Sequence, residues 1–111
     1  MDLFFKFKDD IWKPENQRLV ICNNTTLHKW HVSRKVIRNE KLKDIDKVRL
    51  GYFAFHNGVM LLINERLPGM KDLTEDKEIP IGGSVEITDG KKILLSNEEG
   101  GRLFITTITN N

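Results

Sequence analysis

Apolar and polar residues alternate in short runs along most of this chain, and a period of two is typical of β-strands that bury one face. The first run places Leu3, Phe5 and Phe7 on the same side. The pattern predicts strands at residues 3–7, 17–22, 28–37 (one strand or a pair), 48–55, 59–63, 84–88, 91–96 and 102–109. Short strands separated by turns indicate an all-β fold with little helix, an antiparallel β-sandwich or a barrel.

The stretch 79–96 carries the strongest local signal. Asp89-Gly90 stands between two apolar-rich runs, which is typical of a β-hairpin whose type I′ turn needs a positive φ at both residues. The apolar residues that would share one face of this hairpin are Val85, Ile87, Ile93 and Leu95, and Leu94 is left over. We therefore expect strands 84–88 and 91–96 to pair with each other.

Polar breaks separate the other strands. Turns or loops are predicted at residues 9–10, 13–16, 23–26 and 56–58. The last of these, His56-Asn57-Gly58, favours a second hairpin. Residues 39–47 are highly charged and predict a loop, with room for a short helical turn at Leu42 and Ile45. Residues 64–78, which contain Pro68-Gly69, are expected to be irregular.

Length and composition limit the class of protein. The 111 residues predict one β-sandwich domain, residues 1–111, with a sizeable core. No apolar run approaches the roughly 20 residues that a membrane-spanning helix needs, and the N-terminal residues do not resemble a signal peptide. A single cysteine, Cys22, excludes an internal disulfide, which fits a reducing compartment. We expect a cytoplasmic protein that does not bind a membrane.

The formal net charge of +2 conceals an uneven distribution along the chain. Residues 28–49 hold eight Lys and Arg against three acidic residues, whereas residues 64–100 hold five against nine. Both segments fit solvated faces. The basic one also fits an anionic partner, although the total is too small for a dedicated nucleic-acid binder.

Candidate catalytic and metal-binding groups have simpler interpretations. On a strand, His28 and His31 would point to opposite faces, so they would not converge on a metal. Cys22 fits a small buried core residue. Acidic pairs at 9–10 and at 44 and 46 fit solvated turns. The glycine pairs at 82–83 and 100–101 are not followed by the helix and Lys-Ser/Thr of a phosphate loop. We expect no enzyme, no cofactor and no metal site.

The aromatic residues admit two interpretations. They could stack nucleic-acid bases if they lay on an exposed sheet beside the basic segment. Most of them, however, stand at alternating strand positions, where core packing is the simpler explanation. The expected core aromatics are Phe5, Phe7, Trp30, Phe53, Phe55 and Phe104.

The order of several short motifs resembles that of the forkhead-associated (FHA) domain. The matching residues are Arg18, Ser33-Arg34, Asn57-Gly58, Asn64-Glu65-Arg66-Leu67 and the closing GGSVEITDGKKILLS, which together cover residues 17–96. The resemblance implies an eleven-strand β-sandwich whose loops at one end bind phosphothreonine peptides. It also implies that Arg18, Ser33 and Arg34 contact the phosphate and that Asn57 contacts the peptide backbone.

Three residues depart from the FHA pattern: Gln17 replaces its Gly, Val36 its His and Val59 its Thr. In the family, that His and Thr brace the binding loops, so the departures favour a module that kept the fold and lost the phosphate chemistry. Binding is expected at the loop end formed by residues 23–34 and 56–66. The predicted ligand-binding residues are Arg18, Ser33, Arg34, Lys35, Asn57 and Asn64.

Three classes of function remain open at this point. The first is a non-catalytic module that binds a partner protein, either phosphothreonine-dependent or not. The second is a structural or assembly subunit of a larger complex. The third is a small β-barrel for single-stranded nucleic acid, which the modest charge disfavours. Binding assays with phosphothreonine peptides and with single-stranded oligonucleotides would separate the first from the third.

Overall fold

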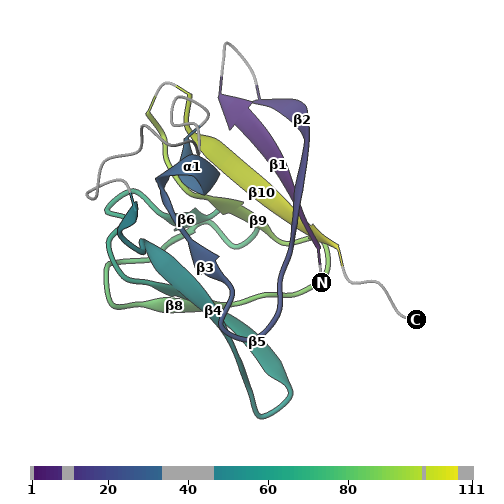
Figure 1. Ribbon diagram of the computed structural model, residues 1–111, viewed down its shortest axis with the longest axis vertical. Coiled ribbons are helices and arrows are strands. Elements are labelled where there is room, and N and C mark those ends of the chain that lie inside the picture. Colours follow the sequence, from purple (N-terminus) through teal and green to yellow (C-terminus); the bar gives the residue numbers. More distant parts are fainter. Residues whose placement is uncertain (1, 9–11, 34–46, 99, 108–111) are drawn as a thin grey trace.

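The computed structural model describes residues 2–8, 12–33, 47–98 and 100–107, with side chains from Leu19 onward. The strands are β1 (Asp2–Lys8), β2 (Trp12–Val20), β3 (Thr26–Leu27), β4 (Gly51–His56), β5 (Val59–Asn64), β6 (Lys71–Asp72), β7 (Lys77–Glu78), β8 (Ser84–Glu86), β9 (Lys92–Leu94) and β10 (Arg102–Thr107). A single-turn helix, α1 (Lys29–Val32), lies at the start of the basic segment 28–49 (Figure 1).

The strands form two antiparallel sheets. One sheet has the order β2-β1-β10-β9-β6-β7, and the other has the order β3-β4-β5-β8. The prediction of an all-β fold with antiparallel sheets and little helix is therefore confirmed. Figure 1 shows the β4–β5 hairpin extending away from the end of the molecule that carries α1.

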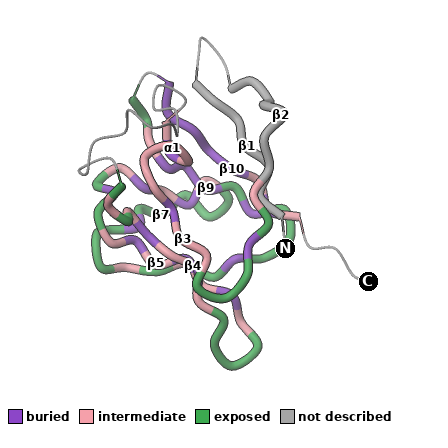
Figure 2. Tube along the Cα trace, viewed as in Figure 1, coloured by how far each residue is buried: buried purple, intermediate pink, exposed green. Residues whose placement is uncertain are grey.

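The core lies between the two sheets. Phe53 on β4 and Phe104 on β10 are fully buried, and their ring centroids lie 6.3 Å apart in a tilted contact that joins one sheet to the other. Leu27, Leu62 and Ile93 are also fully buried in the same cluster. Figure 2 shows the buried positions running through the centre and the exposed tip of the β4–β5 hairpin outside them. Burial of these apolar side chains is the main force that holds the sheets together.

Several predicted strands are present with shifted ends. Residues 3–7 lie in β1, residues 59–63 in β5, and the last predicted strand corresponds to β10. The turn at Asn57-Gly58 is confirmed: both residues have positive φ (52° and 79°), and His56 pairs with Val59 across it. The predicted turns at residues 9–10 and the loop at 39–46 lie outside the described residues.

The predicted hairpin over residues 84–96 is wrong. β8 and β9 both exist, but β8 pairs with β5 in one sheet, whereas β9 pairs with β10 and β6 in the other. The turn between them therefore carries the chain from sheet to sheet. Gly90 has a φ of 77°, as predicted, but Asp89 does not have a positive φ, so the turn is not of type I′.

The strand predicted for residues 28–37 is also wrong where it can be compared. Residues 29–32 form α1, in which the N–H of Ser33 donates to the Lys29 carbonyl (2.9 Å). The His28 N–H donates to Nδ1 of His31 (2.9 Å), and the His28 ring stacks on Trp30 with centroids 4.4 Å apart. These local contacts give the chain an alternative to an extended strand.

Other expectations fail at single segments. Residues 13–16 belong to β2 and do not form a loop, and residues 64–78 contain the short β6–β7 pair. Cys22 is exposed, and Phe55 is 57% exposed, so neither belongs to the core. Phe55 lies near the tip of the β4–β5 hairpin, beyond the part of β4 that the other sheet covers.

Candidate functional site

A cleft of about 380 Å³ opens where three connections meet at the end of the sandwich that carries α1. The connections are α1 with Ser33, the segment that follows β5, and the link from β9 to β10. Its apolar lining consists of Val32, Leu50, Leu67, Pro68, Gly69 and Leu95. Its polar and charged lining consists of Lys29, Ser33, Arg66, Ser96, Asn97 and Glu98. We call it the loop cleft.

Asn64 supports one wall of the loop cleft through hydrogen bonds to the backbone beneath it. Its side chain is fully buried, and its Nδ2 donates to the carbonyls of Leu67 (2.6 Å) and Ile79 (2.8 Å). Its Oδ1 accepts from the Leu67 N–H at 2.8 Å. A buried amide with three such bonds fixes the path of the chain, because an unpaired backbone group there would be costly. Asn64 therefore positions Arg66 and Leu67 in the cleft wall.

The opposite wall depends on Gly101 and Arg102. Gly101 forms a bridge with Ser33, and a Cβ at residue 101 would lie 2.8 Å from the Glu98 carbonyl oxygen, so only glycine fits there. The buried Arg102 donates from Nη1 to the Trp30 carbonyl (2.5 Å) and thereby ties β10 to α1. The link from β9 to β10 and the end of α1 are held against each other by these contacts.

Two basic residues, Lys29 and Arg66, line the loop cleft. Arg66 lies at the surface and donates from Nη1 to the Arg49 carbonyl (2.6 Å). Arg49 itself is engaged by Glu65, with Nε–Oε1 and Nη2–Oε2 distances of 2.5 and 2.8 Å, and this hydrogen-bonded pairing raises the pKa of Arg49. A guanidinium has five N–H donors, so Arg66 can bond both a backbone carbonyl and an anionic ligand.

The predicted site residues fall at different places. Ser33 lines the loop cleft, and Asn64 lies buried beneath its wall. Asn57 stands at the exposed tip of the β4–β5 hairpin, where its Nδ2 lies 3.2 Å from the Nε2 of His56. Because Asn57 lies in the turn before the six-residue strand β5 and Asn64 is the last residue of that strand, the structure separates them by roughly 20 Å. Ser33 and Asn57 are therefore not brought together.

The remaining predicted residues cannot be placed in this geometry. Arg34 and Lys35 follow Ser33 directly in the sequence but lie outside the described residues. Arg18 belongs to β2, where its backbone pairs with Phe4, and its side chain is outside the described part. Their roles stay predictions.

Lys29 and Arg66 lie within the predicted binding segments 23–34 and 56–66, but neither was among the predicted ligand-binding residues. Arg66 is followed by Leu67-Pro68-Gly69, a turn signal that places a basic residue at the end of a strand, and this could have singled it out. Lys29 was not singled out because its segment was wrongly assigned as a strand.

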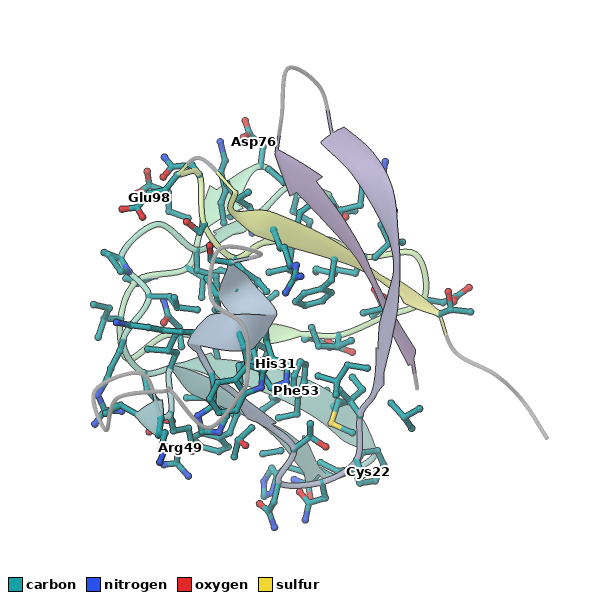
Figure 3. The ribbon with its side chains drawn as sticks, turned by 45° about the horizontal axis from the view of Figure 1, so that its top comes forward. Cys22, His31, Arg49, Phe53, Asp76 and Glu98 are labelled. Atoms are coloured by element: carbon teal, nitrogen blue, oxygen red, sulfur yellow. The ribbon has the colours of Figure 1, made fainter. Side chains whose placement is uncertain are left out.

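Figure 3 shows His31 at α1, Glu98 on the β9–β10 link and Phe53 between the sheets.

Comparisons with known proteins add no relative. A scan against family models found no match, and searches of curated proteins and of solved structures found none either. Within the described residues, no cluster of three or more His, Cys, Asp or Glu side chains could hold a metal ion. None of the helical residues described forms a segment long and apolar enough to cross a membrane.

Proposed function

We propose that this chain is a non-catalytic interaction module that binds a segment of a partner protein in the loop cleft. One observation carries the proposal: three connections, distant in sequence, build a hollow with an apolar floor and a rim of hydrogen-bonding and charged groups. Recognition sites usually combine an apolar surface with a few placed polar groups. Loops held by a rigid β-sandwich are a common place for such sites.

The lining indicates the chemistry of the bound segment. Leu67 and Leu95 supply the floor for one apolar side chain, and both are buried in the core that supports them. Lys29 and Arg66 favour an acidic group on the ligand over a basic one, because Glu98 is the only acid among the described lining residues. We infer that the partner segment places an apolar residue next to an anionic residue.

The anionic residue of the partner is inferred to be a carboxylate rather than an obligatory phosphothreonine. Val36 and Val59 stand where the FHA pattern has the His and Thr that brace phosphate-binding loops. Arg and a hydroxyl such as Ser33 bind either group by charge-assisted hydrogen bonds. Of the residues that the FHA resemblance assigns to the site, Ser33 lines the loop cleft and Asn57 does not. The departures from the FHA pattern support the loss of strict phosphate dependence.

Peptide display on the purified chain tests the proposal. Selected sequences are expected to share an apolar residue beside Asp or Glu, and a selected peptide is then synthesised with Asp, Thr or phosphothreonine at the acidic position. Arg66→Ala should weaken binding of the Asp peptide about tenfold, because a charge-assisted hydrogen bond contributes roughly 1.5–3 kcal/mol. Lys92→Ala is the matched control, since Lys92 is basic and exposed but does not line the cleft.

Three results would contradict the proposal. The first is a selection without a common acidic position, and the second is an Arg66→Ala variant that binds as tightly as the unmodified chain. The third is tight binding of single-stranded oligonucleotides that displaces the peptide, which would favour a nucleic-acid protein. Binding of the phosphothreonine peptide alone would show that the phosphate chemistry has been retained.

A further inference from the structure

β8 (Ser84–Glu86) has an open edge. It is the last strand of the order β3-β4-β5-β8, so within the described part of the chain β5 is its single neighbour. An open edge presents backbone N–H and C=O groups that can pair with a further strand. The edge is therefore the first feature that points to a peptide partner at this place.

The hydrogen-bond register shows which groups of β8 face outward. The Ile87 N–H donates to the Met60 carbonyl (2.8 Å), and the Asn64 N–H donates to the Gly83 carbonyl (2.9 Å). Bonded and non-bonded pairs alternate in an antiparallel ladder, so Gly83, Val85 and Ile87 face β5. The backbone groups of Ser84 and Glu86 consequently point to the open side.

A groove of about 330 Å³ runs along this edge, between β8 and the β6–β7 pair of the other sheet. Ser84, Val85 and Glu86 line one side, and Glu75, Lys77 and Glu78 line the other. The groove shares no lining residue with the loop cleft. A strand added to β8 would place its alternate side chains in this groove.

The groove is acidic once its buried pair is set aside. Lys91 and Asp72 neutralise each other, with Nζ and Oδ2 2.8 Å apart and both side chains almost fully buried. Glu75 lies between two of the lysines, with its Oε2 3.9 Å from Lys77 Nζ and its Oε1 4.0 Å from Lys91 Nζ, so Glu78 and Glu86 are the exposed charges that remain among the described lining residues. Two carboxylates without an opposing base in the lining favour a cationic occupant.

The charges also argue against a second copy of this chain as the occupant. Pairing two β8 edges would bring two acidic grooves to the same interface, and like charges placed together disfavour association. A segment rich in Lys or Arg would instead gain cross-strand attraction at the same positions. We propose that the edge of β8 binds an extended, basic segment of a partner protein as an added strand. This second surface is independent of the loop cleft.

Fluorescence anisotropy with a labelled Lys-Val-Lys-Val-Lys-Val peptide tests the proposal on the full chain. The peptide should bind, the matching Glu-Val peptide should not, and added salt should weaken the complex because charge contributes to it. The sharper test uses two peptides that are N-methylated at alternate positions. Since only every second N–H of an added strand faces β8, one of the two methylated peptides should lose binding and the other should retain it.

Two variants test the protein side. Ser84→Pro removes an outward N–H at the first position of β8, a place where proline is tolerated, and Glu86→Lys reverses an exposed charge of the groove. Glu86→Lys should weaken peptide binding at least about tenfold, because it replaces a charge-assisted contact by repulsion, and Ser84→Pro should weaken it roughly several-fold, the effect of losing one neutral hydrogen bond. Glu98→Lys is the control, because it reverses an exposed charge at the loop cleft and should leave this binding unchanged.

Specific results would overturn the proposal. Equal binding of both N-methylated peptides, or Glu86→Lys binding as tightly as the unmodified chain, would mean that no strand is added at β8. A dimer that forms without peptide and dissociates in Ser84→Pro would mean that a second copy covers the edge. Glu86→Lys keeps the test valid if Ser84→Pro fails to fold, and thermal melts of each variant check the fold.

Discussion

Two turns with nearly the same dipeptide lead to opposite outcomes. Asn57-Gly58 joins β4 to β5, and these strands pair with each other over six residue pairs. Asp89-Gly90 joins β8 to β9, and those strands lie in different sheets. In the first turn both central residues have positive φ, which gives the twist that a tight hairpin needs, whereas in the second only Gly90 does.

The second turn is held by a distant residue. Thr106 on β10 is buried; its carbonyl accepts from the Gly90 N–H (2.9 Å), and its Oγ1 accepts from the Lys91 N–H (3.0 Å). Its hydroxyl also donates to the Thr88 carbonyl. The central residues of both turns are exposed, so burial of the turn itself does not distinguish them. A turn signal therefore specifies where the chain reverses, and tertiary contacts decide which strands then pair.

One residue in the sequence already pointed to this difference. A strand that buries one face leaves every second residue exposed. Ile93, Leu94 and Leu95 are consecutive and all buried, but only Ile93 and Leu95 belong to the core cluster between the sheets. Leu94, which the hairpin interpretation left over, is buried on the opposite face, so the chain is covered on both faces here. A run of three apolar residues should have been weighed against the Asp-Gly signal.

The largest expected effect comes from breaking the buried Lys91–Asp72 ion pair beside the second turn. Lys91 follows Gly90, and its buried ammonium pairs with Asp72 of β6. Asp72→Asn leaves this charge without its close partner, and breaking a buried pair on one side costs about 3–5 kcal/mol. Urea denaturation should show this loss. The double variant Asp72→Asn with Lys91→Met should recover much of it, and an unchanged midpoint in the single variant would contradict the account.

Gly90→Val should give the next largest loss of stability. It tests whether the positive φ of Gly90 matters in the second turn, which tertiary contacts also hold. A Cβ at residue 90 would meet no atom within 4 Å, so the change adds strain at a φ of 77° without a steric clash. We expect a loss of about 1–3 kcal/mol. Gly90→Asn is the control, because Asn tolerates positive φ far better than Val. Equal melting temperatures for Val and Asn at this position would show that φ does not limit stability there.

The sequence predicted the fold class because alternation and turn residues are local signals. The Asn57-Gly58 turn and the burial of Phe53 and Phe104 needed no knowledge of distant contacts. The division of strands between sheets depended on Thr106, which is far from the turn in sequence. The helical turn α1 depended on the contacts of His28 with Trp30 and His31, which a period of two cannot reveal.

The candidate site was only partly predictable for a related reason. Ser33 was identified and lines the loop cleft, but Asn64 was identified as a ligand contact and its side chain is fully used beneath the surface. Both are polar residues at strand or helix ends, and burial separates their roles. Burial arises from the packing of segments distant in sequence, so sequence pattern alone could not distinguish a contact residue from a supporting one.

The smallest expected loss of stability comes from breaking an exposed ion pair of the β6–β7 region, which can be compared with the buried pair nearby. Lys71 and Asp76 pair at 2.8 Å, but Asp76 is 85% exposed, whereas Lys91 and Asp72 are buried. The hydrogen bond and charge of Lys71 lower the pKa of Asp76, so the exposed pair stabilises the fold above the ordinary aspartate pKa. That contribution is lost as the pH falls below about 4 and through the lowered pKa.

Asp76→Asn isolates this charge, because Asn also tolerates the φ of 55° at residue 76. The variant should melt slightly below the unmodified chain at neutral pH, and the difference should close as the pH falls through the lowered pKa of Asp76, because the protonated carboxyl, like the amide of Asn, carries no charge. High salt should close the same gap, since exposed pairs are screened, and should leave the Asp72→Asn defect nearly unchanged. A gap for Asp76→Asn that persists in acid would assign its effect to the hydrogen bond or the turn, not to the charge. If high salt reduced the stability loss of both variants equally, burial would not be what distinguishes the Lys91–Asp72 pair from the exposed Lys71–Asp76 pair.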